Sequence, residues 1–414
     1  ANPPYIQLQR ALDSTNKYAD LYKNLGYEVF DRMGDIYCLF YERGMNILKD
    51  KGHLTFITSN KWMRAGYGEK LREFFSRYNP KVLIDLGPNV FENATVDTCI
   101  VIIQRATNEK RTRAVTITGN NRDHLNIVQE LKENGVVLTN LTKNTWFIGS
   151  NAEQRLKEKI ERIGKPLKDW DVRIYYGIKT GLNEAFIIDS AKREEILRNC
   201  KDEEERKKTE EIIKPILRGR DIKRYYYEWA GLWVIGTFPA LRLDINDYPA
   251  LRKYFLDNFD IRQLEQTGKK YSEFGFSARK KTGNKWFETQ DQIAYYYEFE
   301  KEKVVWGNIS YDSQFAIADH SVVINAPANF LVSDHESIKY LCGAMNSRVF
   351  DMEFKRIGIF LGNAYEWKKQ YVEKVRIPPV TQDNLETVHQ IESLVGKIIS
   401  IKKQNPQEDT SAYE

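Results

Sequence analysis

The sequence has few residues of the kinds that hold metals or disulfides, and it has no long apolar run. Its four cysteines are widely scattered with no CxxC pair, which argues against a disulfide framework or a zinc site and predicts reduced thiols in a bacterial cytoplasm. The five histidines are also dispersed, without triad or metal spacing, so we expect no metal. Apolar runs such as residues 99–103 are far shorter than the roughly 20 residues that span a bilayer, so no membrane partner is expected.

Charge of one sign is also not in large excess. The 63 basic and 58 acidic residues give a net charge of +5, which permits a nucleic-acid partner but does not demand one. Aromatic residues are abundant, with eight Trp, 24 Tyr and 20 Phe, and stacking on bases is a second use for them besides filling a core. A length of 414 residues predicts two domains, with room for a helical tail.

The chain opens with Ala1-Asn2-Pro3-Pro4-Tyr5, its most informative stretch. Two adjacent prolines fix two φ angles and leave carbonyls without competing N–H donors. The Asn2 side chain and the Pro3 carbonyl can both accept hydrogen bonds from the exocyclic amine of a planar base, and Tyr5 can stack on its ring. For an isolated match of this length, a frayed, proline-rich terminus is the alternative.

Helices and strands alternate after this motif. The strands expected are residues 54–58, 81–87 and 98–104, and the helices fall within 36–50 and 61–75. Such alternation predicts an α/β sheet.

Together these features resemble the C-terminal half of the adenine-N6 DNA methyltransferases, and in particular the TaqI-like enzymes and the larger type IIG restriction–modification proteins. The blocks that carry the resemblance are the opening motif and residues 36–48, 54–72 and 83–103. The resemblance implies a partial Rossmann-like methyltransferase half, with S-adenosylmethionine as the methyl donor.

The resemblance also implies roles for individual residues. Asn2 and the Pro3 carbonyl would accept hydrogen bonds from the amine of an adenine extruded from the duplex, and Tyr5 would stack on that base. Phe91, in the loop after residues 81–87, would pack against the base, although an anchoring role in the core is the alternative. Transfer would be direct, with positioning and desolvation supplying the rate enhancement.

The chain departs from this family at its start, where only Ala1 precedes Asn2. The cofactor strands of the family come before the motif, and the sole Gly-x-Gly of this half, Gly66-Tyr67-Gly68, lacks a third glycine and does not directly follow a strand. We expect this tripeptide to form a turn. The cofactor motif would then belong to a missing N-terminal region of a larger parent, which in a type IIG protein also carries a nuclease, and this chain alone would be inactive.

Later blocks resemble the target-recognition domain that follows the catalytic domain in the same enzymes, and they imply an α+β domain that binds double-stranded DNA. Basic residues interleave with tyrosines at 212–227 and with aromatic residues at 269–286, as suits a DNA groove. The residues predicted to contact DNA are Arg218, Arg220, Lys223, Arg224, Lys280, Lys281 and Lys285. The second patch also contains Arg279 and reads as a mobile loop, and Lys355 with Arg356 is a third candidate. A solvated surface with salt bridges is the alternative.

These patterns predict three parts: 1–144 for the C-terminal half of a methyltransferase domain, 145–380 for target recognition, and 381–414 for a closing helix and a disordered tail. The leading hypothesis is part of a site-specific DNA adenine-N6 methyltransferase of a restriction–modification system. A DNA-binding specificity module without catalysis is the alternative, and an unrelated α/β protein with basic surface patches is the third.

Overall fold

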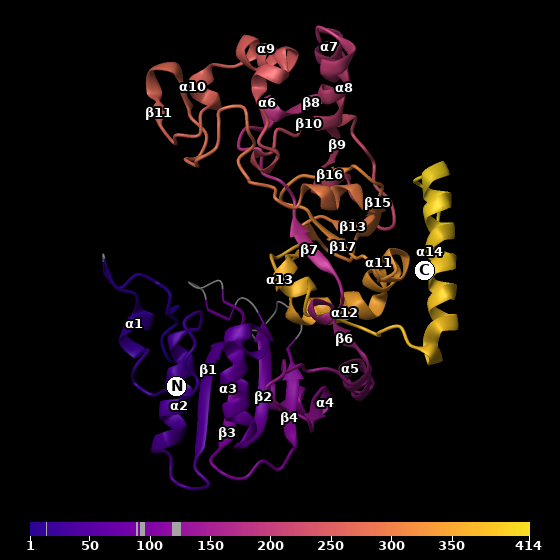
Figure 1. Cartoon of the computed structure of the whole chain (residues 1–414). Helices are drawn as coiled ribbons and strands as arrows, with labels where there is room; N and C mark the ends of the chain where they lie inside the picture. Colours follow the sequence, from indigo (N-terminus) through magenta and orange to yellow (C-terminus); the bar gives the residue numbers. More distant parts are fainter. Residues whose placement is uncertain (14, 88–89, 92–95, 118–125) are drawn as a thin grey trace. The chain divides into compact units, whose positions relative to one another are not determined.

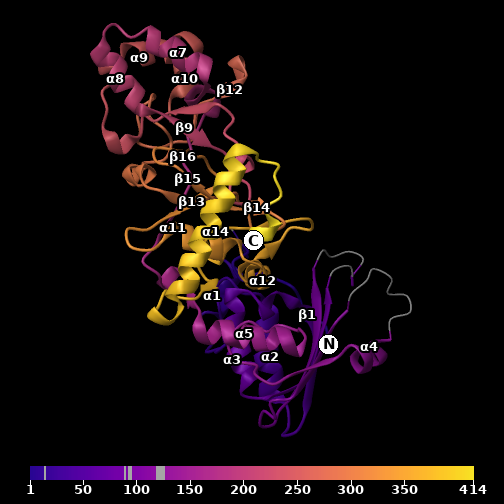
Figure 2. The ribbon, with the colours of Figure 1, turned by 90° about the vertical axis from the view of Figure 1, so that its right-hand side faces the viewer.

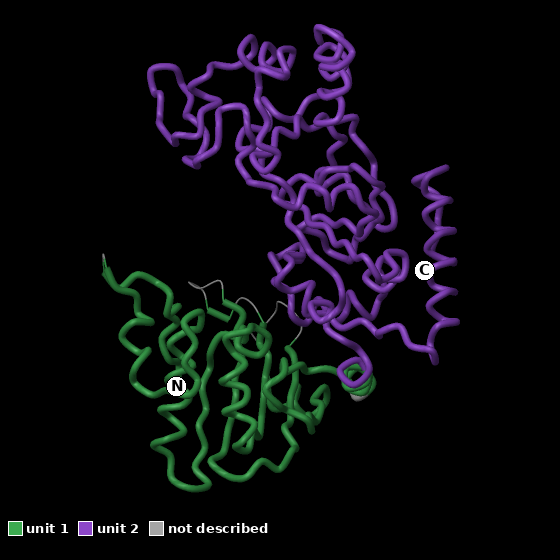
Figure 3. The backbone as a smooth tube through the Cα atoms, viewed as in Figure 1, with its two compact units in different colours: residues 1–159 green, residues 160–414 purple. Residues whose placement is uncertain are grey.

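The computed structural model describes the whole chain except residues 14, 88–89, 92–95 and 118–125 (Figure 1). It divides into two compact units, Ala1–Lys159 and Ile160–Glu414 (Figure 3). The division falls inside helix α5 (Asn151–Ile163), after the boundary expected at 144/145.

The first unit is built on a five-stranded mixed sheet. In spatial order its strands are β1 (His53–Ser59), β3 (Thr98–Gln104), β2 (Asn79–Gly87), β4 (Thr112–Thr116) and β5 (Val136–Leu138). β3 is antiparallel to both β1 and β2, whereas β2 and β4 are parallel. Strands β1, β2 and β4 therefore run in the same direction, and their carboxyl ends meet at one edge of the sheet.

Alternation along the strands sends side chains to two cores. Leu83, on one face of β2, joins the large cluster formed with helices α2 (Ile36–Ile47) and α3 (Glu69–Ser76). Its neighbour Ile84 faces the other way, into a smaller cluster with Leu131 of α4 (Ile127–Glu133). The period of two is that of a strand covered on both faces, which accounts for the near-continuous apolar run of β3.

The second unit contains two four-stranded sheets. One has the order β15 (Phe315–Ala318), β13 (Lys303–Trp306), β17 (Asn329–Val332), β7 (Arg173–Tyr176), and the other β16 (Val323–Ile324), β9 (Ile213–Leu217), β10 (Leu232–Ile235), β8 (Ile187–Asp189). Strands β7 and β8 follow one another along the chain. They lie in different sheets because the short helix α6 (Asn183–Phe186) intervenes.

Helices of the second unit pack against both sheets. Two consecutive helices, α7 (Ser190–Arg198) and α8 (Glu203–Ile212), are separated at Asp202, which caps the second by accepting from the Glu205 amide. Near the C-terminus, α14 (Leu385–Gln404) packs on α11 (Ile338–Asn346) (Figure 2).

The remaining elements are short. They are α1 (Tyr18–Tyr22), α9 (Pro249–Asn258), α10 (Ile261–Leu264), α12 (Arg348–Ile357), α13 (Lys369–Val372), β6 (Lys165–Pro166), β11 (Lys270–Tyr271), β12 (Phe276–Ser277), β14 (Ile309–Ser310), β18 (Ile359–Phe360), β19 (Tyr365–Glu366) and β20 (Arg376–Ile377).

The tail after α14 differs from the expectation of disorder. Lys402 Nζ donates to the carbonyls of Pro406 and Glu408 at 3.1 and 2.7 Å, and Thr410 is buried. Glu414 forms an ion pair with Arg224. The polar composition of the tail did not reveal these contacts, and the ion pair with Arg224 joins residues 190 positions apart in the sequence.

Candidate functional site

The opening motif follows the edge strand β1 of the first unit. The Ala1 nitrogen donates to the Thr55 carbonyl at 2.8 Å, and the Ala1 carbonyl accepts from the Ile57 amide at 3.0 Å. This pair of bonds is the pattern of neighbouring parallel strands. The chain then leaves β1 toward its carboxyl end, so Asn2 lies at the edge where the carboxyl ends of the parallel strands meet. In open α/β sheets, that edge is where ligands bind.

Asn2 and Pro3 are arranged differently. Asn2 is exposed, whereas Pro3 is buried and anchors the motif. Within the part of the chain that the structure describes, neither the Asn2 carboxamide nor the Pro3 carbonyl has a hydrogen-bond partner. The Asn2 carboxamide is therefore open to a donor from outside the chain, and the Pro3 carbonyl is an unused acceptor beside it.

Tyr5 and Phe91, both predicted from the sequence, lie against each other. Their ring centroids are 6.3 Å apart with planes inclined by 66°, an edge-to-face contact. Tyr5 is half-buried and donates its hydroxyl to the Ile57 carbonyl at 3.3 Å. Burial, with smaller contributions from Cys99 and Asp35, raises the pKa of Tyr5 to about 12, so the phenol stays protonated. Hence Phe91 belongs to an aromatic cluster that begins at the opening motif.

Sequence reasoning missed other groups at this edge. Asn60, which follows β1, is buried and donates through Nδ2 to Asp85 Oδ1 at 2.9 Å. The same carboxylate accepts from the Gly87 amide at 3.1 Å, and Arg64 lies 4.0 Å from its other oxygen. The available signal was a polar residue directly after β1 and a carboxylate in the last residues of the largely apolar strand β2. These contacts fix the ends of β1 and β2 beside the aromatic cluster.

The Gly66-Tyr67-Gly68 segment forms a single 3-10 turn before α3, as predicted. A Cβ on Gly68 would lie 2.0 Å from the carbonyl oxygen of Trp62, so this glycine permits a close backbone approach. Arg72 donates to that same carbonyl and to the Ala65 carbonyl. The turn is packed against the protein's own backbone and offers no open cradle.

The first basic cluster of the second unit consists of Arg218, Arg220, Lys223 and Arg224, and among the described residues all but Arg220 donate hydrogen bonds from their side chains to other groups of the chain. Arg218 forms a two-point ion pair with Asp221, and this hydrogen bonding raises the pKa of Arg218. Arg224 donates to Glu414, Ser313 and the Asn346 carbonyl. Lys223 Nζ donates to the Arg220 carbonyl at 2.9 Å, whereas the Arg220 side chain is exposed.

The second cluster is ordered, and its arginine is internal. Arg279 is buried and donates to the carbonyls of Thr180, Leu264, Trp286 and Glu288, so it is held inside the unit rather than in a surface loop. Lys280 and Lys281, next to it, are exposed. Lys285 is exposed and donates to the Leu243 carbonyl at 3.2 Å.

The third candidate is neutralised locally, because Lys355 forms ion pairs with Asp312 and Asp351 at 2.5 and 2.7 Å. Arg356 is buried.

Across the described residues, no group of three or more His, Cys, Asp or Glu side chains could hold a metal ion. No described helix is both long enough and apolar enough to cross a lipid bilayer.

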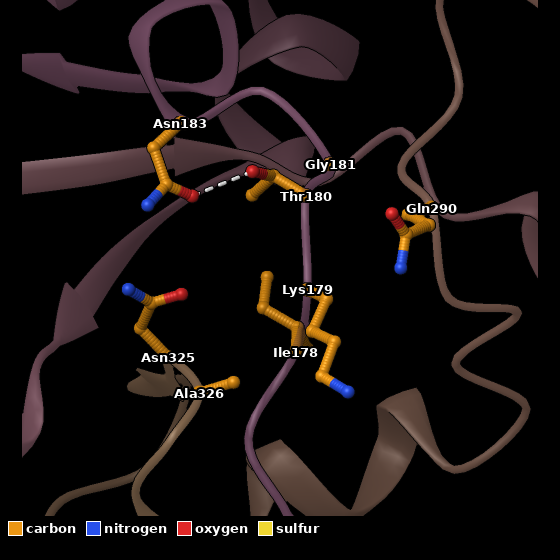
Figure 4. A pocket seen from close by; sticks show the side chains of 8 residues that line it. All are labelled: Ile178, Lys179, Thr180, Gly181, Asn183, Gln290, Asn325 and Ala326. Carbon is orange, nitrogen blue, oxygen red and sulfur yellow. Dashed lines mark hydrogen bonds between the residues drawn. The ribbon is translucent and has the colours of Figure 1, made fainter. Parts of the chain in front are cut away.

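A pocket of about 320 Å³ opens in the second unit, and no sequence pattern pointed to it (Figure 4). Its lining combines amides, a lysine and small residues: Ile178, Lys179, Thr180, Gly181, Asn183, Gln290, Asn325 and Ala326. These residues come from the segment after β7, from α6, from the loop before β13 and from the segment after β16.

Two family descriptions match the chain. Residues 1–91 match the Eco57I restriction-modification methylase, and residues 214–378 match the TaqI-like C-terminal specificity domain. The type II methyltransferase M.BstVI of Geobacillus stearothermophilus is 22% identical over 97% of this chain and 73% of its own length. The type II methyltransferase M.PaeR7I of Pseudomonas aeruginosa is 24% identical over 91% of this chain and 63% of its own length.

A solved structure shares the fold. The type IIL restriction-modification enzyme MmeI, determined in complex with DNA, superposes with a TM-score of 0.58 at 12% identity, over 99% of this chain. The chain spans about half the length of that protein, 50%. The chain thus carries an Eco57I-type restriction–modification methylase segment in its first unit and a TaqI-like C-terminal specificity domain in its second.

Proposed function

We propose that this chain is part of a site-specific DNA adenine-N6 methyltransferase of a bacterial restriction–modification system. The observation that carries the proposal is the contact between Tyr5 and Phe91 beside the exposed Asn2, at the carboxyl edge of the sheet. The match of this segment to a restriction–modification methylase supports it, as do the type II methyltransferases among the relatives.

In this proposal the opening motif holds an adenine that has left the duplex, at a cost of a few kcal/mol of unstacking. The Asn2 carboxamide oxygen and the Pro3 carbonyl accept hydrogen bonds from its amine, and both acceptors are free among the described residues. Tyr5 and Phe91 contact the base. Because the amine is neutral, two fixed acceptors orient its lone pair without a strong base, and positioning carries the rate.

S-adenosylmethionine is the methyl donor that methyltransferase relatives imply. It would supply the methyl group and leave as the thioether S-adenosylhomocysteine, while the methylated amine would lose one proton to solvent. The described residues of the first unit do not fit a complete site for S-adenosylmethionine. The Gly66–Gly68 turn is closed against Trp62. Asp35, a carboxylate near Tyr5, already accepts from the Ile6 amide at 2.9 Å. We propose that the remaining contacts come from a further region of the complete enzyme.

The second unit would bind double-stranded DNA through its exposed cations. Arg220, Lys280 and Lys281 are the predicted residues whose side chains are most open to a partner. Arg218 and Arg224 would act mainly by holding the surface in shape, since both are engaged internally. The specificity-domain match and the DNA complex of MmeI support this assignment.

The test is methyl transfer by the complete enzyme, with and without Asn2→Ala. We expect this change to lower methylation of duplex DNA at least about 100-fold, because one of the two fixed acceptors is lost, while DNA affinity stays nearly intact. Gln7→Ala is the matched control, since Gln7 is an exposed carboxamide close to the motif. Methylation that survives Asn2→Ala at the level of the Gln7 control would refute the role of Asn2.

A second candidate function is a DNA-binding specificity module without chemistry. The poor fit of the first unit to S-adenosylmethionine favours it for the chain alone. Calorimetric titration of the complete enzyme with S-adenosylmethionine separates the two, because a protein whose role is specificity alone should give no heat of binding.

A further inference from the structure

The pocket of the second unit has a rigid floor. Ile178 and Asn325 form a parallel bridge, in which the Ile178 amide donates to the Ile324 carbonyl and the Ala326 amide to the Ile178 carbonyl. The Asn325 amide donates to the Leu217 carbonyl at 2.8 Å. These bonds join the floor to strands β9 and β16, so side chains on it are fixed in direction.

Asn325 is the unusual residue of this floor. It is only 8% exposed, yet its carboxamide has no hydrogen-bond partner among the described residues. Its polar atoms are not fully covered, unlike the unpaired Trp62 Nε1 and Thr98 Oγ1, so they reach the solvent of the pocket. A group bound in the pocket could take the place of that solvent.

Other amide donors surround the same space. Figure 4 shows Asn183 and Asn325 on one side of segment 178–181 and Gln290 on the other. Asn183 Oδ1 accepts from the Thr180 hydroxyl at 2.7 Å, which leaves its Nδ2 amine as the free end of that carboxamide. The lining therefore offers three amide NH2 groups, of which that of Asn183 is oriented by the bond to Thr180.

Two basic and two acidic side chains lie near the pocket, and they differ in whether the protein's own groups already engage them. Lys179 is exposed, and its Nζ lies 5.3 Å from the Tyr176 ring centroid, with no ion-pair partner within the described part of the chain. Arg279 lies beneath and donates to the Thr180 carbonyl at 3.0 Å. The nearby carboxylates accept backbone bonds, Asp291 from the Lys179 amide and Glu288 from the Lys285 amide. Lys179 is thus the charge free to meet a ligand.

We propose that this pocket binds a phosphate of the duplex backbone, with Lys179 and the amides of Asn183, Gln290 and Asn325 as donors. A phosphate only accepts hydrogen bonds, so it matches the amide NH2 groups together with one cation. The carboxamides alone would also suit a base edge, but a base would leave the Lys179 ammonium without an anionic partner. The inference rests on the proposed DNA binding by the second unit. It adds an anchoring site that fixes register without reading sequence.

The experiment measures binding of the full chain to a fluorescein-labelled duplex of mixed sequence by anisotropy at several salt concentrations. Lys179→Ala should weaken binding equally on duplexes of different sequence and lower the slope of log K against log salt by about 1. Asn325→Asp, which sets a carboxylate toward the phosphate, should weaken binding more than Asn325→Leu. Lys397→Ala, an exposed lysine on α14, is the matched control.

Each outcome decides the matter. An unchanged salt slope and affinity for Lys179→Ala, with wild-type binding intact, would overturn the pocket assignment and leave the proposed function standing. A loss confined to one duplex sequence would overturn it too, because it would indicate base reading. Absence of duplex binding by the wild-type chain would refute the proposed DNA binding and this inference together. Thermal unfolding of each variant shows whether it still folds. If inorganic phosphate bound in the pocket while Lys179→Ala left duplex binding unchanged, the pocket would be a site for free anions and the assignment to the duplex backbone would be wrong.

Discussion

Replacing Arg279 should destabilise the second unit rather than remove a surface DNA contact. Arg279 is 4% exposed, and its guanidinium donates to the carbonyls of Leu264, Thr180, Glu288 and Trp286, at 2.8, 3.0, 2.7 and 2.6 Å. It also lies 4.8 Å from the centre of the Phe186 ring. One side chain therefore ties together three segments of the backbone.

The size of the effect follows from what Arg279→Ala leaves behind. Four carbonyls lose a charged donor. Those of Thr180 and Glu288 keep a second donor, from the Gln290 amide and from Gln266 Nε2. Those of Leu264 and Trp286 keep none among the described residues, and each buried acceptor without a partner costs about 1–3 kcal/mol. Against this, burial lowers the pKa of Arg279 to about 10, so holding the charge inside the fold has a cost that the variant recovers. Water can also enter the gap and serve some carbonyls. We expect a net loss of about 3–5 kcal/mol in the free energy of unfolding, as for other buried charges whose partners are removed.

Urea unfolding followed by tryptophan fluorescence measures this loss. Lys280→Ala is the matched control, because Lys280 is the next residue and is exposed, and it should change stability by less than about 0.5 kcal/mol. Arg279→Lys should recover little, since an ammonium cannot reach four separated carbonyls. If Arg279→Ala left the unfolding free energy within about 1 kcal/mol of the wild type but weakened duplex binding, the structural role argued for Arg279 would be wrong.

Two further predictions concern stability. Burial raises the pKa of Glu353 to about 7, so the folded state holds this proton more tightly than the unfolded state. The protonated Glu353 contributes about 3 kcal/mol to the free energy of unfolding below about pH 4.5, and this contribution is lost as the pH rises through 7. In a profile of urea unfolding against pH, Glu353→Gln should flatten that part of the curve. An unchanged profile would contradict the raised pKa. Gly68→Ala should lower the free energy of unfolding by at least about 2 kcal/mol in the same assay, because the added Cβ would lie 2.0 Å from the Trp62 carbonyl oxygen. Gly66→Ala is the control and should be nearly neutral, because open space surrounds Gly66. Equal effects of the two changes would argue against the packed turn.

The elements of the first unit could be predicted because their signals are local. The run at 98–104 is apolar and β-branched, and the structure forms β3 over the same residues. The opening motif and Phe91 could be singled out as separate stretches. Their contact could not be derived from spacing alone, since it depends on how β1 and β2 align through β3.

The basic clusters show what composition leaves open. Arg218 and Arg220 look alike in the sequence, but Asp221 is three residues from the first and engages it, while the second stays exposed. Arg279 resembles Lys280 and Lys281 in charge, yet a planar donor with five N–H groups suits a buried bundle of carbonyls. The pocket around Asn325 joins residues about 150 positions apart, from 178 to 326, which no local pattern reveals.

The identity of the methylated nucleoside tests the central claim most directly. DNA treated with the complete enzyme and S-adenosylmethionine is digested to nucleosides and analysed by mass spectrometry. The arrangement of Asn2, Pro3, Tyr5 and Phe91 predicts N6-methyladenine, formed with the wild-type protein and lost with Asn2→Ala. Methylated cytosine as the only product, or N6-methyladenine formed equally well without the Asn2 carboxamide, would contradict it.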